Sequence, residues 1–166
     1  MSKFKSGAGF TILEIIVVVF IIAMGLVGVL SLIIQNVQVQ YIHKNTLIAS
    51  QLAQEGLELV RNTRDNNWLV VNPWNYDLVL ENYIVDYTGS LSSVTDISEA
   101  KLQLGNTGFY WHDTTASDPD TIFSRLITIA QGPELNDSLN VSCLVQWSEK
   151  SGVREYVVDT ILYNWR

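Results

Sequence analysis

The sequence predicts an α+β protein with one long N-terminal helix packed on a C-terminal antiparallel β-sheet. Three observations lead to this prediction. Residues 15–34 are apolar and uncharged, the residues that follow place apolar side chains at helical spacing, and the residues after Trp68 alternate between apolar and polar side chains. These periodicities are typical of a membrane-type helix, an amphipathic helix and half-buried strands.

The apolar run over residues 15–34 is long enough to cross a bilayer. At about 1.5 Å of rise per residue it reaches roughly 30 Å, the thickness of the hydrocarbon core. Residues 1–9 precede it and contain Lys3 and Lys5, which the positive-inside rule keeps in the cytoplasm. A secretory signal peptide has a shorter apolar centre and a small-residue cleavage site. We therefore expect a retained single-pass anchor.

We predict one continuous helix over residues 11–63, because apolar side chains gather on one face at 100° per residue. That face comprises Tyr41, Ile48, Ala49, Leu52, Ala53, Gly56, Leu59 and Val60. Leu47 and Leu57 fall outside it and are expected to meet neighbouring subunits. Glycine costs a helix about 1 kcal/mol relative to alanine, so Gly56 on this face predicts a close approach by the sheet.

The helix is predicted to stop at residues 65–67, an Asp-Asn-Asn sequence typical of a turn, with Arg61 and Arg64 favourably placed near its C-terminal end. Five strands are expected beyond it, over residues 83–87, 108–111, 121–130, 139–147 and 153–162. The last two form the clearest hairpin. A meander of four or five antiparallel strands laid on the helix is the expected arrangement.

Composition excludes several function classes. The 166 residues carry a net charge of −7, which is unsuited to contacts with phosphate, so no nucleic-acid partner is expected. Cys143 is the single cysteine and cannot form an internal disulfide; within an alternating strand we interpret it as a buried small hydrophobe. The two histidines, His43 and His112, have no nucleophile or orienting group at interpretable spacing, so we do not expect an enzyme.

Two further groups of side chains could bind ligands. Asp113, Asp118 and Asp120 could supply oxygen ligands to calcium, but their spacing lacks the alternation and the terminal Glu of an EF-hand, and we favour a solvated loop. The aromatic residues that could stack on sugars are Trp68, Trp74, Tyr76 and Trp111. We favour core positions for them, because large aromatic side chains dominate small cores. No cofactor is expected.

Glu14 lies at the edge of the apolar run, and a carboxylate placed in hydrocarbon costs about 2.5 to 3.5 kcal/mol or more. Thr11 and Glu14 match a capping box, in which the two side chains satisfy each other's helix-start amides. On that interpretation Glu14 only starts a helix near the lipid headgroups. The residues alone leave open whether it also pairs with a positive charge.

The stretch Gly9-Phe10-Thr11-Ile12-Leu13-Glu14, after a basic leader and before an apolar run, resembles the N-terminal processing signal of type IV pilins and of the pseudopilins of type II secretion. The resemblance implies a type IV pilin-like fold, cleavage between Gly9 and Phe10 by a membrane aspartyl prepilin peptidase, and N-methylation of Phe10. It divides the chain into a leader (1–9), a transmembrane and filament-core helix (10–34), an amphipathic continuation (35–64) and a β-rich extracytoplasmic domain (65–166).

The function implied by this resemblance is that of a structural subunit, a minor pilin, of a bacterial type IV pilus-like filament. Its implied partners are other pilin subunits through the N-terminal helix, the prepilin peptidase and methyltransferase, the inner-membrane assembly platform, and membrane lipid before assembly. The precursor would be a single-pass protein of the cytoplasmic membrane with its N-terminus in the cytoplasm, and the assembled filament would be extracellular or periplasmic. Glu14 would set the assembly register by pairing with the freed amine of Phe10 on a neighbour, since a mismatch would leave a buried charge unpaired.

The chain departs from well-known major pilins in two respects. It has no cysteine pair near its C-terminus, and Ser31 stands where many pilins have a helix-kinking proline. Gly25 and Gly28 could instead loosen the helix during packing. Two alternatives stay open: a pseudopilin of a type II secretion or competence apparatus, and a non-polymerising membrane-anchored binding domain.

Overall fold

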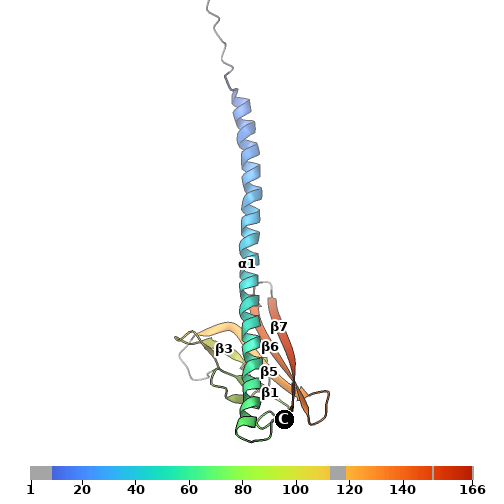
Figure 1. The fold of residues 1–166 in the computed structure, drawn as a ribbon. Coiled ribbons are helices and arrows are strands. Elements are labelled where there is room, and N and C mark those ends of the chain that lie inside the picture. The colour runs from blue at the N-terminus through green and yellow to red at the C-terminus, as the bar shows by residue number, and fades with distance from the viewer. Residues whose placement is uncertain (1–8, 113–118, 151, 166) are drawn as a thin grey trace, which may run out of the picture. The chain divides into compact units, whose positions relative to one another are not determined.

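The computed structural model describes residues 9–112, 119–150 and 152–165 (Figure 1). The chain divides into two compact units, Met1–Lys44 and Asn45–Arg166. Helix α1 (Ile12–Leu69) runs through both units. The α+β prediction is confirmed, and the layout of one long helix followed by an antiparallel sheet is consistent with a pilin-like fold.

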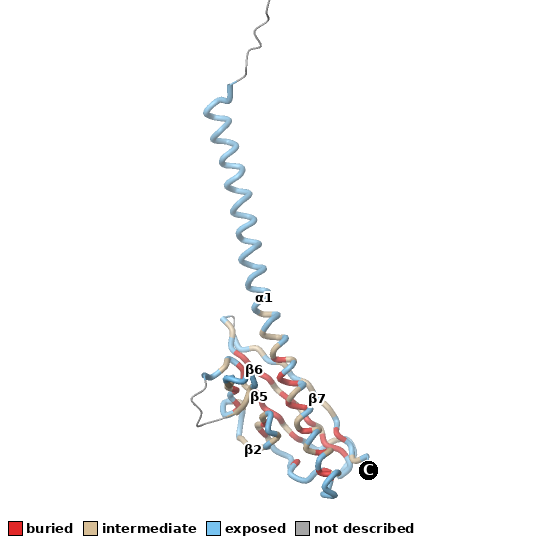
Figure 2. Tube along the Cα trace, turned by 60° about the vertical axis from the view of Figure 1, so that its left-hand side comes forward, coloured by how far each residue is buried: buried red, intermediate tan, exposed pale blue. Residues whose placement is uncertain are grey.

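In the first unit, α1 carries its apolar side chains on every side. Residues 9–41 are all exposed (Figure 2). The helix is long and apolar enough to cross a membrane. An apolar surface of this extent is not stable in water and requires an apolar environment.

In the second unit, the predicted helix stop is wrong, since α1 continues to Leu69. Asn67 is buried, and its Nδ2 donates to the carbonyl oxygens of Trp74 (3.2 Å) and Tyr76 (2.7 Å). An asparagine that satisfies its amide in this way stabilises the last turn instead of ending the helix. Arg61 and Arg64 therefore precede the last turn, which contains no basic residue.

The C-terminal end of α1 has a Schellman-type hydrogen-bond pattern. Asn72 N donates to Asn67 O (2.9 Å) and Val71 N donates to Trp68 O (3.3 Å). Glycine is usual at the left-handed position of this motif, yet here Val71 occupies it with a φ of 62° and a 90% exposed side chain. A β-branched residue in that region is strained.

Within the described residues the sheet has seven strands, all paired antiparallel. In chain order they are β1 (Asn82–Val85), β2 (Leu91–Ser93), β3 (Lys101–Leu104), β4 (Tyr110–Trp111), β5 (Asp120–Gln131), β6 (Ser138–Glu149) and β7 (Gly152–Tyr163), with the 3-10 helix η1 (Ile97–Glu99) between β2 and β3. One edge of β5 pairs with both β1 and β3, and the other edge pairs with β6, which in turn pairs with β7.

The predicted meander is therefore wrong, because β5 pairs along one edge with β1 and β3, neither of which directly precedes it in the chain. Strands β2 and β3 were not expected, and the strand predicted over residues 108–111 shortens to Tyr110–Trp111. Strands of two to four residues are too short to show a clear alternation. The long hairpin β6–β7 is confirmed.

The core forms where the second half of α1 packs on β5, β6 and β7. Its centre contains Ala49, Leu52, Ala53, Val60, Ile127, Val141, Cys143 and Val145. The predicted helix face is confirmed at most positions, but Tyr41, which belongs to the first unit, is 64% exposed. Leu57 is buried, contrary to prediction, so the sheet covers a wider arc of the helix than one stripe.

Gly56 is the point of closest approach between helix and sheet, as predicted. A Cβ atom added there would lie 2.8 Å from Cys143 Sγ and 3.3 Å from Arg125 Cδ. Side chains essentially never come so close, so only glycine fits without a shift of the neighbours.

Candidate functional site

The candidate site begins where the chain enters α1. Gly9, Phe10 and Thr11 are exposed and precede the helix, which starts at Ile12. The Phe10 side chain is 77% exposed. The peptide bond between Gly9 and Phe10 is thus neither helical nor covered by described residues, so a peptidase can reach it.

Thr11 caps the helix. Its Oγ1 accepts a hydrogen bond from Glu14 N (3.3 Å), while Ile15 N donates to Thr11 O (3.2 Å). This is one half of the predicted capping box, and no bond from the Glu14 carboxylate back to Thr11 N is present in the described structure. The cap therefore depends on the Thr11 hydroxyl, and the carboxylate of Glu14 stays available for another role.

No ion pair within the described residues involves Glu14, whose side chain is exposed. The first basic residues that follow it in the sequence are His43 and Lys44. Ion pairs along a helix form between residues three or four apart, so α1 offers Glu14 no cation. A cation that pairs with Glu14 would have to come from outside this helix.

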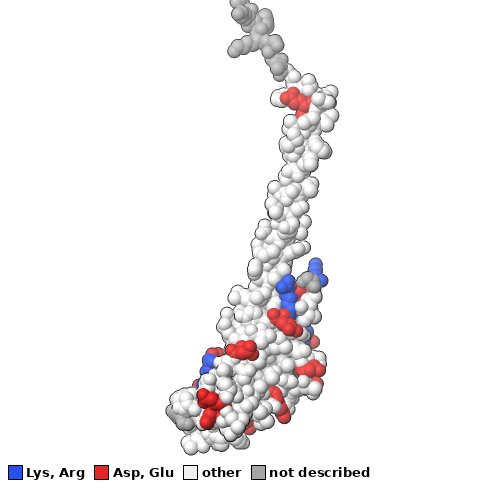
Figure 3. Space-filling model, turned by 90° about the vertical axis from the view of Figure 1, so that its right-hand side faces the viewer, with Lys and Arg blue, Asp and Glu red and all other residues white. Residues whose placement is uncertain are grey.

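The surface after Glu14 is uncharged for several turns. Figure 3 shows this long stretch of the helix without acidic or basic atoms. Ser31 Oγ donates to Val27 O (3.1 Å) and Asn36 Nδ2 donates to Leu32 O (3.0 Å). These side-chain donors are therefore hydrogen-bonded to carbonyl groups of the same helix. The segment is thereby compatible with an apolar environment along its length.

Gly25 and Gly28 lie within unbroken helix, and a Cβ at either position would meet nothing within 4 Å. The structure therefore shows no loosening at these residues in the isolated chain. The predicted loosening concerns packing against other subunits and stays a prediction.

Arg125 is a buried cation that the sequence reasoning missed. Its guanidinium is completely buried; Nη1 donates to Leu52 O (3.2 Å) and lies 3.4 Å from Glu55 Oε2, and Nη2 donates to Val85 O (2.5 Å). It therefore ties α1 to β5 and to the end of β1. The sequence does place Arg125 on the inward face of an alternating strand, and this position could have indicated that it is buried.

Cys143 lies next to this cation and is inert. It is completely buried, and the loss of hydration raises the pKa of its thiol to about 12, although the positive charge of Arg125 opposes this shift. A thiol that stays protonated is not a nucleophile. The interpretation of Cys143 as a small core residue is confirmed.

The two histidines have different surroundings. His43 is exposed on α1. Burial, together with the charge of Arg125, lowers the pKa of His112 to about 4. Its Nδ1 lies 3.0 Å from Lys101 O, which can only accept, so Nδ1 carries the proton and Nε2 is a buried acceptor without a partner among the described residues.

Two of the three calcium candidates, Asp113 and Asp118, lie outside the described residues. Asp120 is exposed, and its Oδ1 accepts a hydrogen bond from Gln103 Nε2 (3.1 Å). Within the described ranges, no three His, Cys, Asp or Glu side chains cluster as metal ligands would.

The aromatic candidates are only partly core residues. Trp74 is buried, and Trp68 packs against the core and contacts Trp165 edge to face, with ring centroids 4.3 Å apart. Tyr76 is 51% exposed, so the prediction that it is a core residue is wrong. Tyr76 lies in the turn after Pro73: its N–H donates to Pro73 O, and its own carbonyl accepts from Asn67 Nδ2.

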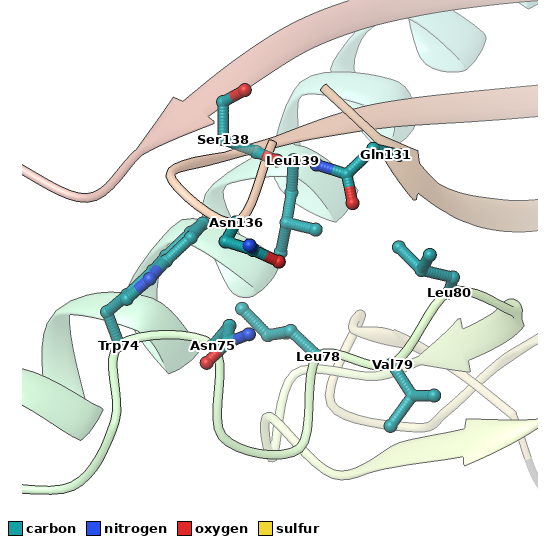
Figure 4. A pocket seen from close by; sticks show the side chains of 9 residues that line it. All are labelled: Trp74, Asn75, Leu78, Val79, Leu80, Gln131, Asn136, Ser138 and Leu139. Carbon is teal, nitrogen blue, oxygen red and sulfur yellow. Dashed lines mark hydrogen bonds between the residues drawn. The ribbon is translucent and has the colours of Figure 1, made fainter. Parts of the chain in front are cut away.

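A cavity of about 290 Å³ lies between the loop after α1 and the β5–β6 turn (Figure 4). It is lined by Trp74, Asn75, Leu78, Val79, Leu80, Gln131, Asn136, Ser138 and Leu139. None of these side chains is ionisable at neutral pH, so the lining offers no acid or base for catalysis.

No family model, curated protein or solved structure matches the chain significantly. Function is therefore inferred from the residues and their geometry.

Proposed function

We propose that this chain is a structural subunit, a minor pilin, of a bacterial type IV pilus-like filament. The observation that carries the proposal is the start of α1. An exposed Gly9–Phe10 peptide bond leads into a capped helix. Its first carboxylate, Glu14, has no cation within one turn on that helix and stands before a long uncharged surface.

The order of events follows from these features. The precursor is inserted with Lys3 and Lys5 on the cytoplasmic side, and the prepilin peptidase cuts after Gly9. The new ammonium group at Phe10 is methylated and keeps its positive charge. During assembly the apolar helices leave the lipid and pack against each other, so that their exposed surface is buried a second time.

Glu14 acts as the register device in this mechanism. In a core of apolar helices, a carboxylate without a partner is strongly destabilising, whereas one paired with the Phe10 ammonium group of a neighbour is tolerated. Only subunits at the correct axial offset bring the two groups together. The β-rich domain covers the second half of α1 and forms the outer part of each subunit.

Mass spectrometry of the mature protein tests the processing step. We expect the chain to begin at Phe10 with one methyl group on its amine. A Gly9→Val variant, which places a bulky side chain at the cut, should keep residues 1–9. An intact leader on the wild-type protein would refute the proposal and favour a non-polymerising anchored domain.

A Glu14→Gln variant tests the register role, because glutamine also serves in a capping box. We expect normal membrane insertion and helix content but reduced incorporation into filaments. Thr11→Ala is the matched control, since it removes the observed cap and keeps the carboxylate. Normal incorporation of Glu14→Gln would eliminate the charge-pairing role.

A further inference from the structure

Strand β7 leaves one edge of the sheet open. It pairs only with β6 in the part of the chain that is described, and this ladder runs without a bulge from Ser138↔Tyr163 to Glu149↔Gly152. Figure 1 shows β7 at the margin of the sheet. Its opposite edge presents unpaired backbone groups along a strand of 12 residues.

The hydrogen-bond parity identifies the residues with free backbone groups. Gly132 N donates to Ser138 O (3.1 Å), so even-numbered residues of β6 bond to β5 and odd-numbered residues bond to β7. Because Cys143 pairs with Val158, the even-numbered residues of β7 bond to β6. The residues that direct N–H and C=O groups to the open edge are Val153, Glu155, Val157, Asp159, Ile161 and Tyr163.

The side chains of these same residues lie on the face of the sheet that is turned away from α1. At even positions, Leu162 is a core residue and Val158 packs against the core under the helix. At an odd position, Val157 is 51% exposed. Val157 continues an apolar row across the sheet, Leu126↔Leu144↔Val157. The rows on either side end in the carboxylates of Glu155 and Asp159.

Proteins usually protect an open edge with a lysine, a proline or a bulge. β7 contains no lysine or proline, and its register is regular. Arg154, its one basic residue, faces the helix side and pairs with Glu149 (2.7 Å). Within β7 as described, the charged residues that direct their backbone groups to the open edge are therefore both acidic, Glu155 and Asp159.

A second copy of β7 does not fit this edge. An antiparallel copy with Val157 opposite Val157 would place Glu155 opposite Asp159, and like charges opposite each other destabilise a strand pair. Shifted registers still gather four carboxylates on one face without a cation. The complementary strand is one that brings positive charge.

We propose that the open edge of β7 receives an extended segment of a partner protein as an additional antiparallel strand. This segment has an apolar residue opposite Val157, flanked at alternate positions by lysine or arginine residues opposite Glu155 and Asp159. Backbone bonds to the odd-numbered residues supply affinity, and the two carboxylates select the partner. The inference does not depend on filament assembly.

A synthetic peptide with the core Thr-Lys-Thr-Val-Thr-Lys-Thr serves as the probe, and the full chain is kept in non-ionic detergent. Fluorescence anisotropy should show saturable binding that weakens with salt. Methylation of the valine nitrogen in the probe removes one backbone donor and should weaken binding about tenfold or more. A probe with the same residues but adjacent lysines distinguishes strand addition from simple charge attraction, and should bind at least several-fold more weakly.

The protein variants are Val157→Pro and Val157→Ala. The proline removes an N–H that points to the open edge and breaks no bond to β6, so the fold should persist while probe binding falls about tenfold. The alanine keeps the N–H and should bind the probe nearly as well as wild type. If Val157→Pro does not fold, the methylated probe still decides the question on the unmodified protein. Failure of the probe to bind, or equal binding of its methylated or adjacent-lysine forms, would overturn the proposal.

Discussion

Replacing Gly56 with alanine tests how closely the sheet approaches α1. The added Cβ would lie 2.8 Å from Cys143 Sγ, 3.3 Å from Arg125 Cδ and 3.4 Å from Ile127 Cδ1, whereas non-bonded carbon atoms prefer about 3.5 to 4.0 Å. Cys143 is completely buried and cannot swing into solvent. Overpacking of this kind costs about 1 to 3 kcal/mol, and alanine regains about 1 kcal/mol of helix propensity. We expect a net destabilisation of up to about 2 kcal/mol.

The assay is urea unfolding of the full chain in detergent, followed by tryptophan fluorescence, since all five tryptophans lie beyond Gly56 in the sequence. Gly28→Ala is the matched control in the same helix, because a Cβ there meets nothing within 4 Å. Adding Cys143→Ala to Gly56→Ala removes the closest atom. The double variant should then be about 1 to 2 kcal/mol more stable than the sum of the two single effects predicts.

A Gly56→Ala protein that unfolds at a higher urea concentration than wild type would refute the reasoning. The same conclusion would follow if the effects of Gly56→Ala and Cys143→Ala were simply additive. In either case the helix and the sheet would not be in the tight contact described.

Three further predictions concern the second unit. Burial lowers the pKa of His112 to about 4, so as pH falls this histidine is protonated in the unfolded chain before it is protonated in the folded one. The free energy of unfolding should therefore drop by up to about 3 kcal/mol between pH 6.5 and pH 4. His112→Gln should flatten this pH profile, and an unchanged profile would contradict the prediction. Asn67→Ala leaves two carbonyl groups without their donor and should cost about 1 to 3 kcal/mol in urea unfolding, against less than about 0.5 for the exposed neighbour Asn66→Ala. Val71→Asn relieves the strain of the left-handed backbone conformation without loss of packing, and should raise the free energy of unfolding by about 1 kcal/mol. The thermal midpoint should rise with it, and a lower midpoint would contradict the prediction that Val71 is strained.

The parts of the fold that could be predicted from sequence are those with a long, regular period. The hairpin expected over residues 139–147 and 153–162 corresponds to β6 and β7 because twelve-residue strands show alternation clearly. Gly56 was informative for a similar reason, since a residue unfavourable in a helix lay on an otherwise apolar face. Both predictions used local signals that the tertiary structure reinforces.

Other features depend on contacts between distant residues and leave little trace in the sequence. The helix end is one example, because Asn67 acts as a helix residue only when Trp74 and Tyr76 present their carbonyl groups to it. Arg125 is another, since its burial requires acceptors from Leu52 and Val85. The order of the strands around β5 likewise could not be deduced from their individual patterns.

The candidate site at the N-terminus is different, because it is a linear motif and every residue of it could be named from the sequence. The structure adds the bond from Glu14 N to Thr11 Oγ1 and the absence of an ion pair to Glu14 within the described residues. The proposed partner of Glu14 lies on another molecule, which no single chain can reveal. For that reason filament assembly stays a proposal with its own tests.

The central place of β5 also sets an order of folding. The β1–β2 and β3–β4 hairpins are local, but both must wait for β5 before they join a sheet. The bond from Arg125 to Leu52 spans 73 residues. Since a chain emerges from the ribosome N-terminus first, the apolar face of α1 beyond Lys44 has no sheet to cover it until the last third of the protein has been made. This late closure of distant contacts predicts slow folding.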